Sequence, residues 1–258
     1  MSYLIDGVMV LLEKIKKLDI SRCWIVIFCL FFLSVIFTST LIQAVVFLLI
    51  LAVCAYKYST RKFGLFLFIL AFAVRLVIIF VVQTPASSDF SILLNASRSL
   101  NRGDLSFLET SYFQLWSYQV GFVFFQSLLL RIWDSIVILK IFNCLICAAT
   151  TVLTYLIAKE FADEKASRAV GLIYCLLPFP LFYTTILTNQ FLATFLILAG
   201  IYILITSKVS LASWKRYLVF SIALALANVI RPESIIPLFS AAIYLVITTK
   251  KTTGKKIW

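Results

Sequence analysis

The sequence "LAFAVRLVIIFVVQTPASSDFSILLNASRSLNRGD", residues 70–104, passes from an apolar run into a polar stretch. The apolar part belongs to residues 63–83, which are enough to cross the hydrocarbon core of a bilayer as a helix. Asp89 is the first acidic residue after this run and stands among serines. The stretch therefore predicts a membrane-spanning helix followed by a polar segment at the membrane edge.

The composition of the whole chain agrees with this interpretation. Hydrophobic residues make up 63% of the sequence and the mean hydropathy is +1.07, whereas soluble domains are roughly 45–50% apolar. The sequence predicts an integral membrane protein. Its apolar segments are residues 23–39, 41–56, 63–83, 117–133, 135–158, 169–187, 189–206, 217–230 and 235–249.

Basic residues lie in clusters between these segments, which predicts the topology rather than a nucleic-acid partner. The clusters are Lys14, Lys16, Lys17 and Arg22; Lys57, Arg61 and Lys62; Lys159, Lys165 and Arg168; Lys208, Lys215 and Arg216; and Lys250, Lys251, Lys255 and Lys256. Because positive loops stay in the cytoplasm, all five should lie on one side.

Thr84 then lies outside, after the third span, and Lys159 lies inside, so the chain must cross the membrane an odd number of times between them. Two apolar segments lie in this interval. We therefore expect the weaker one, residues 117–133, to be interfacial or re-entrant. This gives eight spans with both termini in the cytoplasm, and the alternative of nine places the last two clusters outside.

The predicted fold is all-α, a polytopic transmembrane helical bundle of eight or nine spans in the cell membrane. Apolar residues at helical spacing before Arg22 predict an amphipathic helix on the membrane surface. We expect residues 1–62 to hold this helix and a transmembrane hairpin, and residues 63–258 to form a separate transmembrane core. A short helix opened by Asp89 should lie along the outer membrane face, because Phe90, Leu93, Leu94 and Leu100 form an apolar stripe on one side of it.

The absence of certain residues narrows the chemistry. The sequence has no histidine, so a general base would have to be a carboxylate. The six cysteines all lie in apolar segments, and the spacing of Cys144 and Cys147 is read as helix packing. No glycine-rich loop for a nucleotide is present.

The order of these features resembles the GT-C class of membrane glycosyltransferases, which contains protein O-mannosyltransferases and lipid A aminoarabinose transferases. Residues 70–104, quoted above, look like the first core helix, with its intramembrane arginine, and the outer loop of that class. Residues 118–204, with the break "CLLPFPLFY" at 175–183, are similar to its succeeding helices. The likeness covers roughly residues 63–245.

This resemblance implies a fold in which the outer first loop carries juxtamembrane helices. It also implies an enzyme that moves a sugar from a polyprenyl-phosphate donor to an extracytoplasmic acceptor, with inversion in one displacement. Asp89 matches the first-loop aspartate, which implies a general base or an acceptor-orienting group. As an alternative, Asp89 only favours the dipole of its helix, by about 0.3–1 kcal/mol.

The residues themselves offer the other groups that this transfer needs. Arg75 lies inside a span, where a charge is costly unless it pairs or lines a polar cavity, so it is a candidate for the lipid phosphate. The alternative is a snorkelling or interhelical residue. Arg231 is the second phosphate candidate, with Glu233 orienting it, and the alternative is an ordinary charged turn.

The proline break predicts a pocket at membrane depth. Irregular backbone is tolerated there where it is buried or lines a cavity, so Tyr183, Asn189 and Gln190 are expected to bind sugar or phosphate. A break that serves packing alone is the alternative.

The chain departs from the class in two ways. Many members carry two carboxylates in the first loop and an acid near Gln190, so a divalent cation is doubtful here and no cofactor is predicted. The chain is also shorter than typical members, which predicts an incomplete core. The alternative function is a non-catalytic membrane subunit or pseudoenzyme that binds lipid-linked glycan or a partner protein. A transporter is a third possibility, but it would show paired broken helices, and the sequence shows one clear break.

Overall fold

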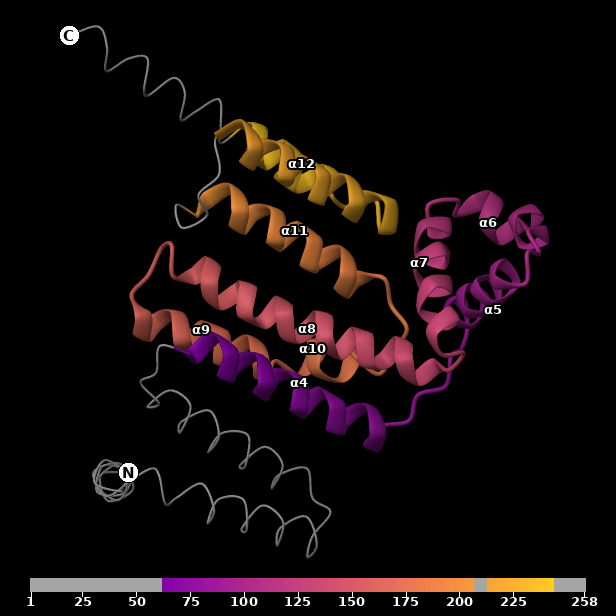
Figure 1. Cartoon of the computed structure of the whole chain (residues 1–258), viewed down its shortest axis with the longest axis horizontal. Coiled ribbons are helices and arrows are strands. Elements are labelled where there is room, and N and C mark those ends of the chain that lie inside the picture. The colour runs from indigo at the N-terminus through magenta and orange to yellow at the C-terminus, as the bar shows by residue number, and fades with distance from the viewer. Residues whose placement is uncertain (1–61, 207–212, 244–258) are drawn as a thin grey trace, which may run out of the picture. The chain divides into compact units, whose positions relative to one another are not determined.

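The computed structural model describes residues 62–206 and 213–243. The chain divides into two units, residues 1–60 and 61–258, and the described residues belong to the second. The predicted amphipathic helix and first hairpin lie outside them. The described elements (Figure 1) are α4 (Phe63–Val81), α5 (Asp89–Asn101), η1 (Ser106–Glu109), α6 (Ser111–Leu115), α7 (Gln119–Ile132), α8 (Ile136–Ala158), α9 (Glu164–Leu176), α10 (Pro178–Tyr183), α11 (Gln190–Ile205) and α12 (Ser213–Ile230).

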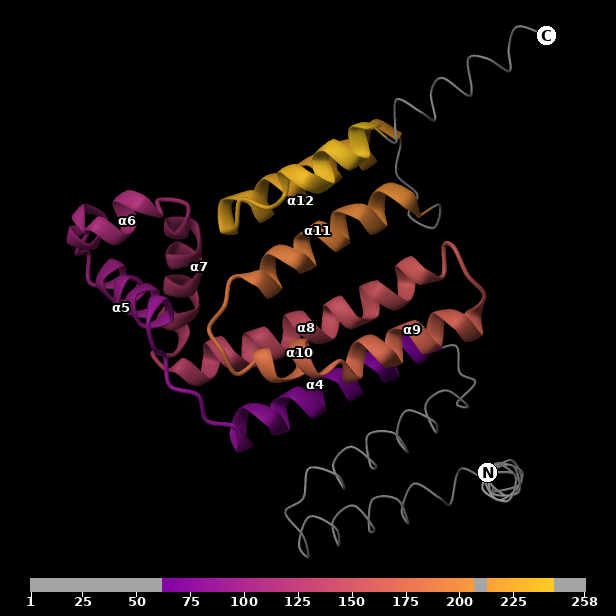
Figure 2. The same ribbon diagram turned by 180° about the vertical axis from the view of Figure 1, so that it is seen from behind.

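The long helices form a bundle. α8 packs against α4, α9 and α11, and α11 packs against α12, as the two opposite views in Figures 1 and 2 show. Among the described helices, α4 with 19 residues and α8 with 23 residues are long and apolar enough to cross a membrane. The all-helical class is confirmed for the described residues, and the count of eight or nine spans stays a prediction.

Residues between α4 and α8 form a compact group, made of α5, η1, α6 and α7, which we call the outer module after its predicted position. Its core contains Leu93, Phe107, Phe113 and Phe122, and it continues into Ala193 of α11 and Ile230 of α12. The apolar side chains of α5 are buried on one face, as the sequence predicts. The predicted short helix opened by Asp89 is therefore confirmed.

Polar side chains join α5 to α7 within this module. The Ser97 hydroxyl lies 3.1 Å from Gln126 Oε1, and Asn101 donates from Nδ2 to the Ser127 carbonyl at 3.0 Å. Arg131 Nε donates to Asn101 Oδ1 at 2.9 Å. α7 has 14 residues, and its predicted interfacial position stays a prediction.

The predicted span at residues 169–187 is divided. α9 ends at Leu176 and α10 begins at Pro178, because proline lacks the backbone N–H that would continue the helix and its ring clashes with the preceding turn. The predicted break is confirmed, and the chain leaves α10 through a non-helical segment that leads to Asn189.

An ion-pair cluster closes the turn between α8 and α9. Glu164 accepts from Lys159 Nζ at 2.6 Å, from Arg168 Nε at 2.8 Å and from the Tyr155 hydroxyl at 2.8 Å. Arg168 also lies over the ring of Phe63 in α4, 4.8 Å from its centroid. Partial desolvation raises the pKa of Glu164, but these hydrogen bonds outweigh it and lower that pKa to about 2.

Replacing Glu164 with glutamine should lower the thermal stability and flatten its pH dependence. The folded-state pKa of about 2 lies below the ordinary 4.5, so the cluster stabilises the fold fully above pH 4.5 and this contribution is lost as the pH falls through about 2. Because the carboxylate is partly exposed, we expect a fall in Tm of only about 1–4 °C near neutral pH.

Thermal unfolding of the full chain in detergent, measured at several pH values, checks this expectation. The wild-type Tm should fall toward acid more steeply than that of E164Q. The exposed Glu109 serves as a matched control, because among the described residues its carboxylate makes no hydrogen bond or ion pair. Identical acid profiles for wild type and E164Q would show that the cluster contributes nothing.

Candidate functional site

Three segments far apart in the sequence bring polar groups together at the end of the bundle next to α7. Arg231 Nη1 donates to Asn189 Oδ1 at 3.2 Å, and Arg231 Nε pairs with Glu233. Asn189 Nδ2 donates to Gln119 Oε1 at 3.1 Å and to the Ile230 carbonyl at 3.2 Å. We call Gln119, Asn189, Arg231 and Glu233 the Arg231 junction.

Within this junction the amide of Asn189 is buried, whereas the charged side chains of Arg231 and Glu233 are partly exposed. Asn189 is 5% exposed, whereas the side chains of Arg231 and Glu233 are 28% and 55% exposed. The buried amide therefore fixes a guanidinium whose other face is open. Among the described residues, Nη2 of Arg231 has no hydrogen-bond partner, so it can donate to an incoming anion.

A glycine allows the close helix approach that forms the junction. A Cβ on Gly121 of α7 would lie 2.0 Å from the carbonyl oxygen of Val229 in α12. Only a residue without a side chain fits there. This contact places Gln119, at the start of α7, within reach of Asn189.

Replacing Gly121 with alanine should push α7 away from α12 and cost about 1–3 kcal/mol of stability, as overpacking does. Gly64→Ala is the matched control, because its Cβ would meet Val152 and Tyr155 at ordinary contact distances of 3.7 and 3.9 Å. Thermal unfolding in detergent measures both variants. Equal stability of G121A and wild type would contradict the close approach.

The other two predicted pocket residues lie close by in sequence but outside the junction's hydrogen bonds. Tyr183 stacks on Phe179 with ring centroids 4.8 Å apart and meets the edge of Phe191 at 6.0 Å. Gln190 begins α11, and its backbone N–H donates to the Thr188 hydroxyl at 3.2 Å. The structure thus joins Asn189, Arg231 and Glu233 of the predicted set.

Asp89 is exposed at the first position of α5 and follows a strained residue. Ser88 has φ 51° and ψ −133°, and it is the one non-glycine residue with positive φ among those described. Such a conformation is costly for a residue with a Cβ and is enriched at functional sites. The Ser88 hydroxyl lies 3.5 Å from Asp89 Oδ1.

Tyr112 of α6 links Asp89 electrostatically to the segment that carries the junction. Burial raises the pKa of Tyr112, and the charges of Asp89 and Tyr118 raise it further. Tyr112 is therefore within electrostatic reach of both residues, and Tyr118 directly precedes Gln119. No hydrogen bond or ion pair joins Asp89 to an arginine within the described ranges.

The remaining acids near the outer module are less suited to proton transfer. The Ser106 backbone N–H donates to Asp104 Oδ1 at 2.9 Å and holds the pKa of Asp104 below its ordinary value. Asp134 is paired with Arg98 at 2.8 Å. Both carboxylates are thus already engaged, which leaves Asp89 and Glu109.

Arg75 lies away from the junction and is enclosed by the bundle. Its side chain is 0% exposed, and Nη1 donates to the Ala71 carbonyl at 3.1 Å. Nε and Nη2 have no hydrogen-bond partner among the described residues, and the thiols of Cys144, Cys147 and Cys175 lie within electrostatic range. Its one hydrogen bond lies within α4, so the phosphate role and the interhelical role both stay predictions.

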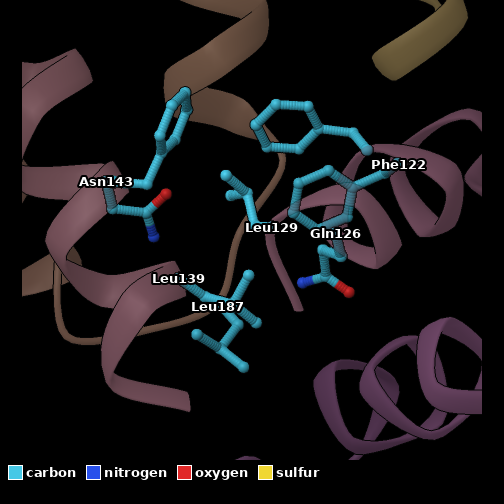
Figure 3. A pocket seen from close by; sticks show the side chains of 8 residues that line it. Phe122, Gln126, Leu129, Leu139, Asn143 and Leu187 are labelled. Atoms are coloured by element: carbon cyan, nitrogen blue, oxygen red, sulfur yellow. The ribbon is translucent and has the colours of Figure 1, made fainter. Parts of the chain in front are cut away.

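A small crevice lies between α7, α8 and the segment that follows α10 (Figure 3). It is lined by Phe122, Phe125, Gln126, Leu129, Leu139, Phe142, Asn143 and Leu187. Gln126 is 2% exposed and Asn143 is 9% exposed. No group of three or more cysteines and acids that could hold a metal ion occurs in residues 62–206 and 213–243.

Comparison with known families now adds to this geometry. Residues 120–258, more than half of the chain, match the family described as dolichyl-phosphate-mannose-protein mannosyltransferase. The chain belongs to this family. At the level of that family it is a membrane glycosyltransferase that uses a lipid-linked sugar, which confirms the GT-C resemblance. No curated protein and no solved structure matches the chain.

The matched range of the mannosyltransferase family includes Asn189, Arg231 and Glu233 but not Asp89 or Arg75. Sequence reasoning missed Gln119 and Tyr112. Gln119 is a polar residue at the start of a weakly apolar segment. This position at a helix end could have marked it as a candidate site residue. Tyr112 carried no signal, since it is one of 11 tyrosines in the sequence.

Proposed function

We propose that this chain transfers a sugar from a polyprenyl-phosphate donor to an acceptor on the outer side of the cell membrane. The proposal is carried by the position of Arg231. Its guanidinium is partly exposed and hydrogen-bonds to the buried Asn189, and both residues lie in the range matched by the mannosyltransferase family. In this proposal Arg231 binds the donor phosphate, and Glu233 orients Arg231.

The proposed reaction is one displacement with inversion. The acceptor hydroxyl oxygen forms a bond to the anomeric carbon, the bond from that carbon to the phosphate oxygen breaks, and the acceptor proton passes to the Asp89 carboxylate. The polyprenyl phosphate leaves with the electron pair. Arg231 offsets the negative charge that develops on it, and such electrostatic stabilisation is a large term in catalysis.

Several features support Asp89 as the base. Its carboxylate is exposed at the start of α5, so an acceptor can reach it from water. The backbone is strained at the preceding residue, Ser88, as is common at functional sites. Tyr112 lies within electrostatic range of both Asp89 and Tyr118. Tyr183 and Gln190, which flank Asn189 in the sequence, are proposed to contact the sugar.

The arrangement in the membrane belongs to the same proposal. The outer module and the Arg231 junction face outward, and the turn between α8 and α9, which carries Lys159, Lys165 and Arg168, faces the cytoplasm. Both termini then lie in the cytoplasm. The proposed partners are the lipid-linked donor, the bilayer and a second membrane subunit.

The proposal is tested with the full chain in lipid nanodiscs and with radiolabelled dolichyl-phosphate mannose and undecaprenyl-phosphate mannose as donors. Serine- and threonine-rich peptides and a membrane extract of the host serve as acceptors. Label should move from the lipid phase to the acceptor. If the donors bind but no label moves in either acceptor mixture, the chain is a non-catalytic binding subunit instead.

A further inference from the structure

Lys140 is a buried cation near the outer end of α8 whose contacts no known role explains. It is 8% exposed and lies in the amino-terminal part of a helix, where the dipole does not favour a cation. Its ammonium donates to the carbonyl of Thr84 at 2.7 Å and to the Thr84 hydroxyl at 3.3 Å. Within the described ranges no carboxylate pairs with it, so its charge is held by this one residue.

The residue that Lys140 holds makes the polar contacts of the segment before Asp89. Residues 82–88 connect α4 to Asp89, and residues 83–86 form no backbone–backbone hydrogen bond with any described residue. Thr84 makes the hydrogen bonds of this stretch. It accepts from Lys140, and its hydroxyl donates to the Thr185 carbonyl at 2.5 Å. Ala86 of the same stretch packs against the apolar cluster of Leu94, Leu130, Leu139 and Leu187, and Lys140 and Thr84 supply its polar attachment.

The same face of α8 holds the segment that leads to the junction. Asn143 lies three positions after Lys140, on the same side of the helix, and donates from Nδ2 to the Ile186 carbonyl at 2.9 Å. Residues 184–189 run from α10 to Asn189. One helix turn thus fixes both non-helical segments, one ending at Asp89 and the other at Asn189.

We propose that Lys140 is a positioning residue, which ties residues 82–88 to α8 and to residues 184–189 and so sets the distance between Asp89 and the Arg231 junction. Lys140 touches no reacting atom. It acts through the Thr84 carbonyl and hydroxyl, which a buried ammonium holds more strongly than a neutral donor would. The kinetic part of this inference rests on the proposed function, whereas the structural part does not.

Hydrogen exchange by mass spectrometry of the full chain in nanodiscs tests the structural part. Lys140→Met should speed amide exchange about tenfold or more at residues 90–92, whose N–H groups donate to the carbonyls of Ser87 and Ser88 at the start of α5, because the preceding segment loses its anchor. Residues 159–168 at the other end should exchange as in wild type. Lys140→Arg should restore protection. Exchange at residues 90–92 that equals wild type, or that rises equally along the whole chain, would overturn the inference.

Steady-state kinetics with dolichyl-phosphate mannose tests the kinetic part. K140M should lower kcat about 10- to 100-fold, as a small misplacement of a reacting group does, while the donor KM stays within about twofold and K140R recovers most of the loss. A fall in kcat/KM that comes only from a higher donor KM, with kcat unchanged, would overturn the assignment. Lys165→Met, at an exposed lysine of α9, is the control and should leave both parameters unchanged.

A second variant keeps the test decisive if K140M does not fold. Thr84→Val removes the hydroxyl that bridges Lys140 and Thr185 but keeps the carbonyl, so it should give a smaller rise in exchange over the same residues. No rise with T84V would count against the inference. If wild-type protein moves no sugar, the proposed function fails, but the exchange experiment still decides whether Lys140 positions the segment.

Discussion

Asp89→Asn is expected to lower kcat for sugar transfer about 100- to 10,000-fold, which is the range for removing a general base. The amide has the shape of the carboxylate but cannot accept the acceptor proton. Donor binding should change little, because Asp89 makes no contact with Arg231 within the described residues. Steady-state kinetics in nanodiscs with dolichyl-phosphate mannose measures both quantities.

Glu109→Gln is the matched control for this prediction. Glu109 lies in the same outer module, is exposed, and its carboxylate makes no hydrogen bond to a described residue, so it differs from Asp89 mainly in position. E109Q should keep wild-type kcat, and both variants should keep wild-type thermal stability. If D89N retains activity and E109Q loses it, the base has been assigned to the wrong acid.

Arg231→Met is expected to lower kcat/KM for the lipid donor by about 30-fold or more, in line with the 2–5 kcal/mol that truncation of one partner of a hydrogen-bonded charge pair costs. The donor KM should rise. Arg231→Lys should recover part of the loss, because lysine restores the charge but not the planar fork that holds Asn189 and a phosphate together.

Arg102→Met serves as the control for this change. Arg102 is exposed on the outer module, and its guanidinium hydrogen-bonds within the described residues only to Ser99. Loss of affinity in R102M equal to that in R231M would mean that general positive charge, rather than the fixed guanidinium, attracts the donor. Raising the salt concentration should then weaken binding in wild type and R231M alike.

Local patterns in the sequence were sufficient for several elements. The apolar stripe after Ser88 predicts α5, and the two prolines predict the break after Leu176. Asn189 and Arg231, two of the candidate site residues, are joined by a hydrogen bond, and their binding role stays a prediction. Each of these depends on residues close in the chain or on a shared end of the bundle.

Contacts between distant helices could not be predicted in the same way. Gln119 meets Asn189 across 70 positions of sequence, and hydropathy gives no register for such a pair. Lys140 lies in the apolar segment 135–158, where nothing distinguishes a buried anchor from a snorkelling lysine. The apolar run predicted the helix that holds Arg75, but not the thiols that surround its guanidinium.

The buried Arg75 also bears on how the chain enters the membrane during synthesis. A lone arginine at the centre of a helix costs about 2.5–3.5 kcal/mol when the translocon passes that helix into lipid. The helices that enclose it, α8 and α9, emerge from the ribosome later. The other apolar residues of α4 contribute about −0.3 to −0.6 kcal/mol each and offset this cost, so α4 can enter the lipid before α8 and α9 arrive to enclose its arginine.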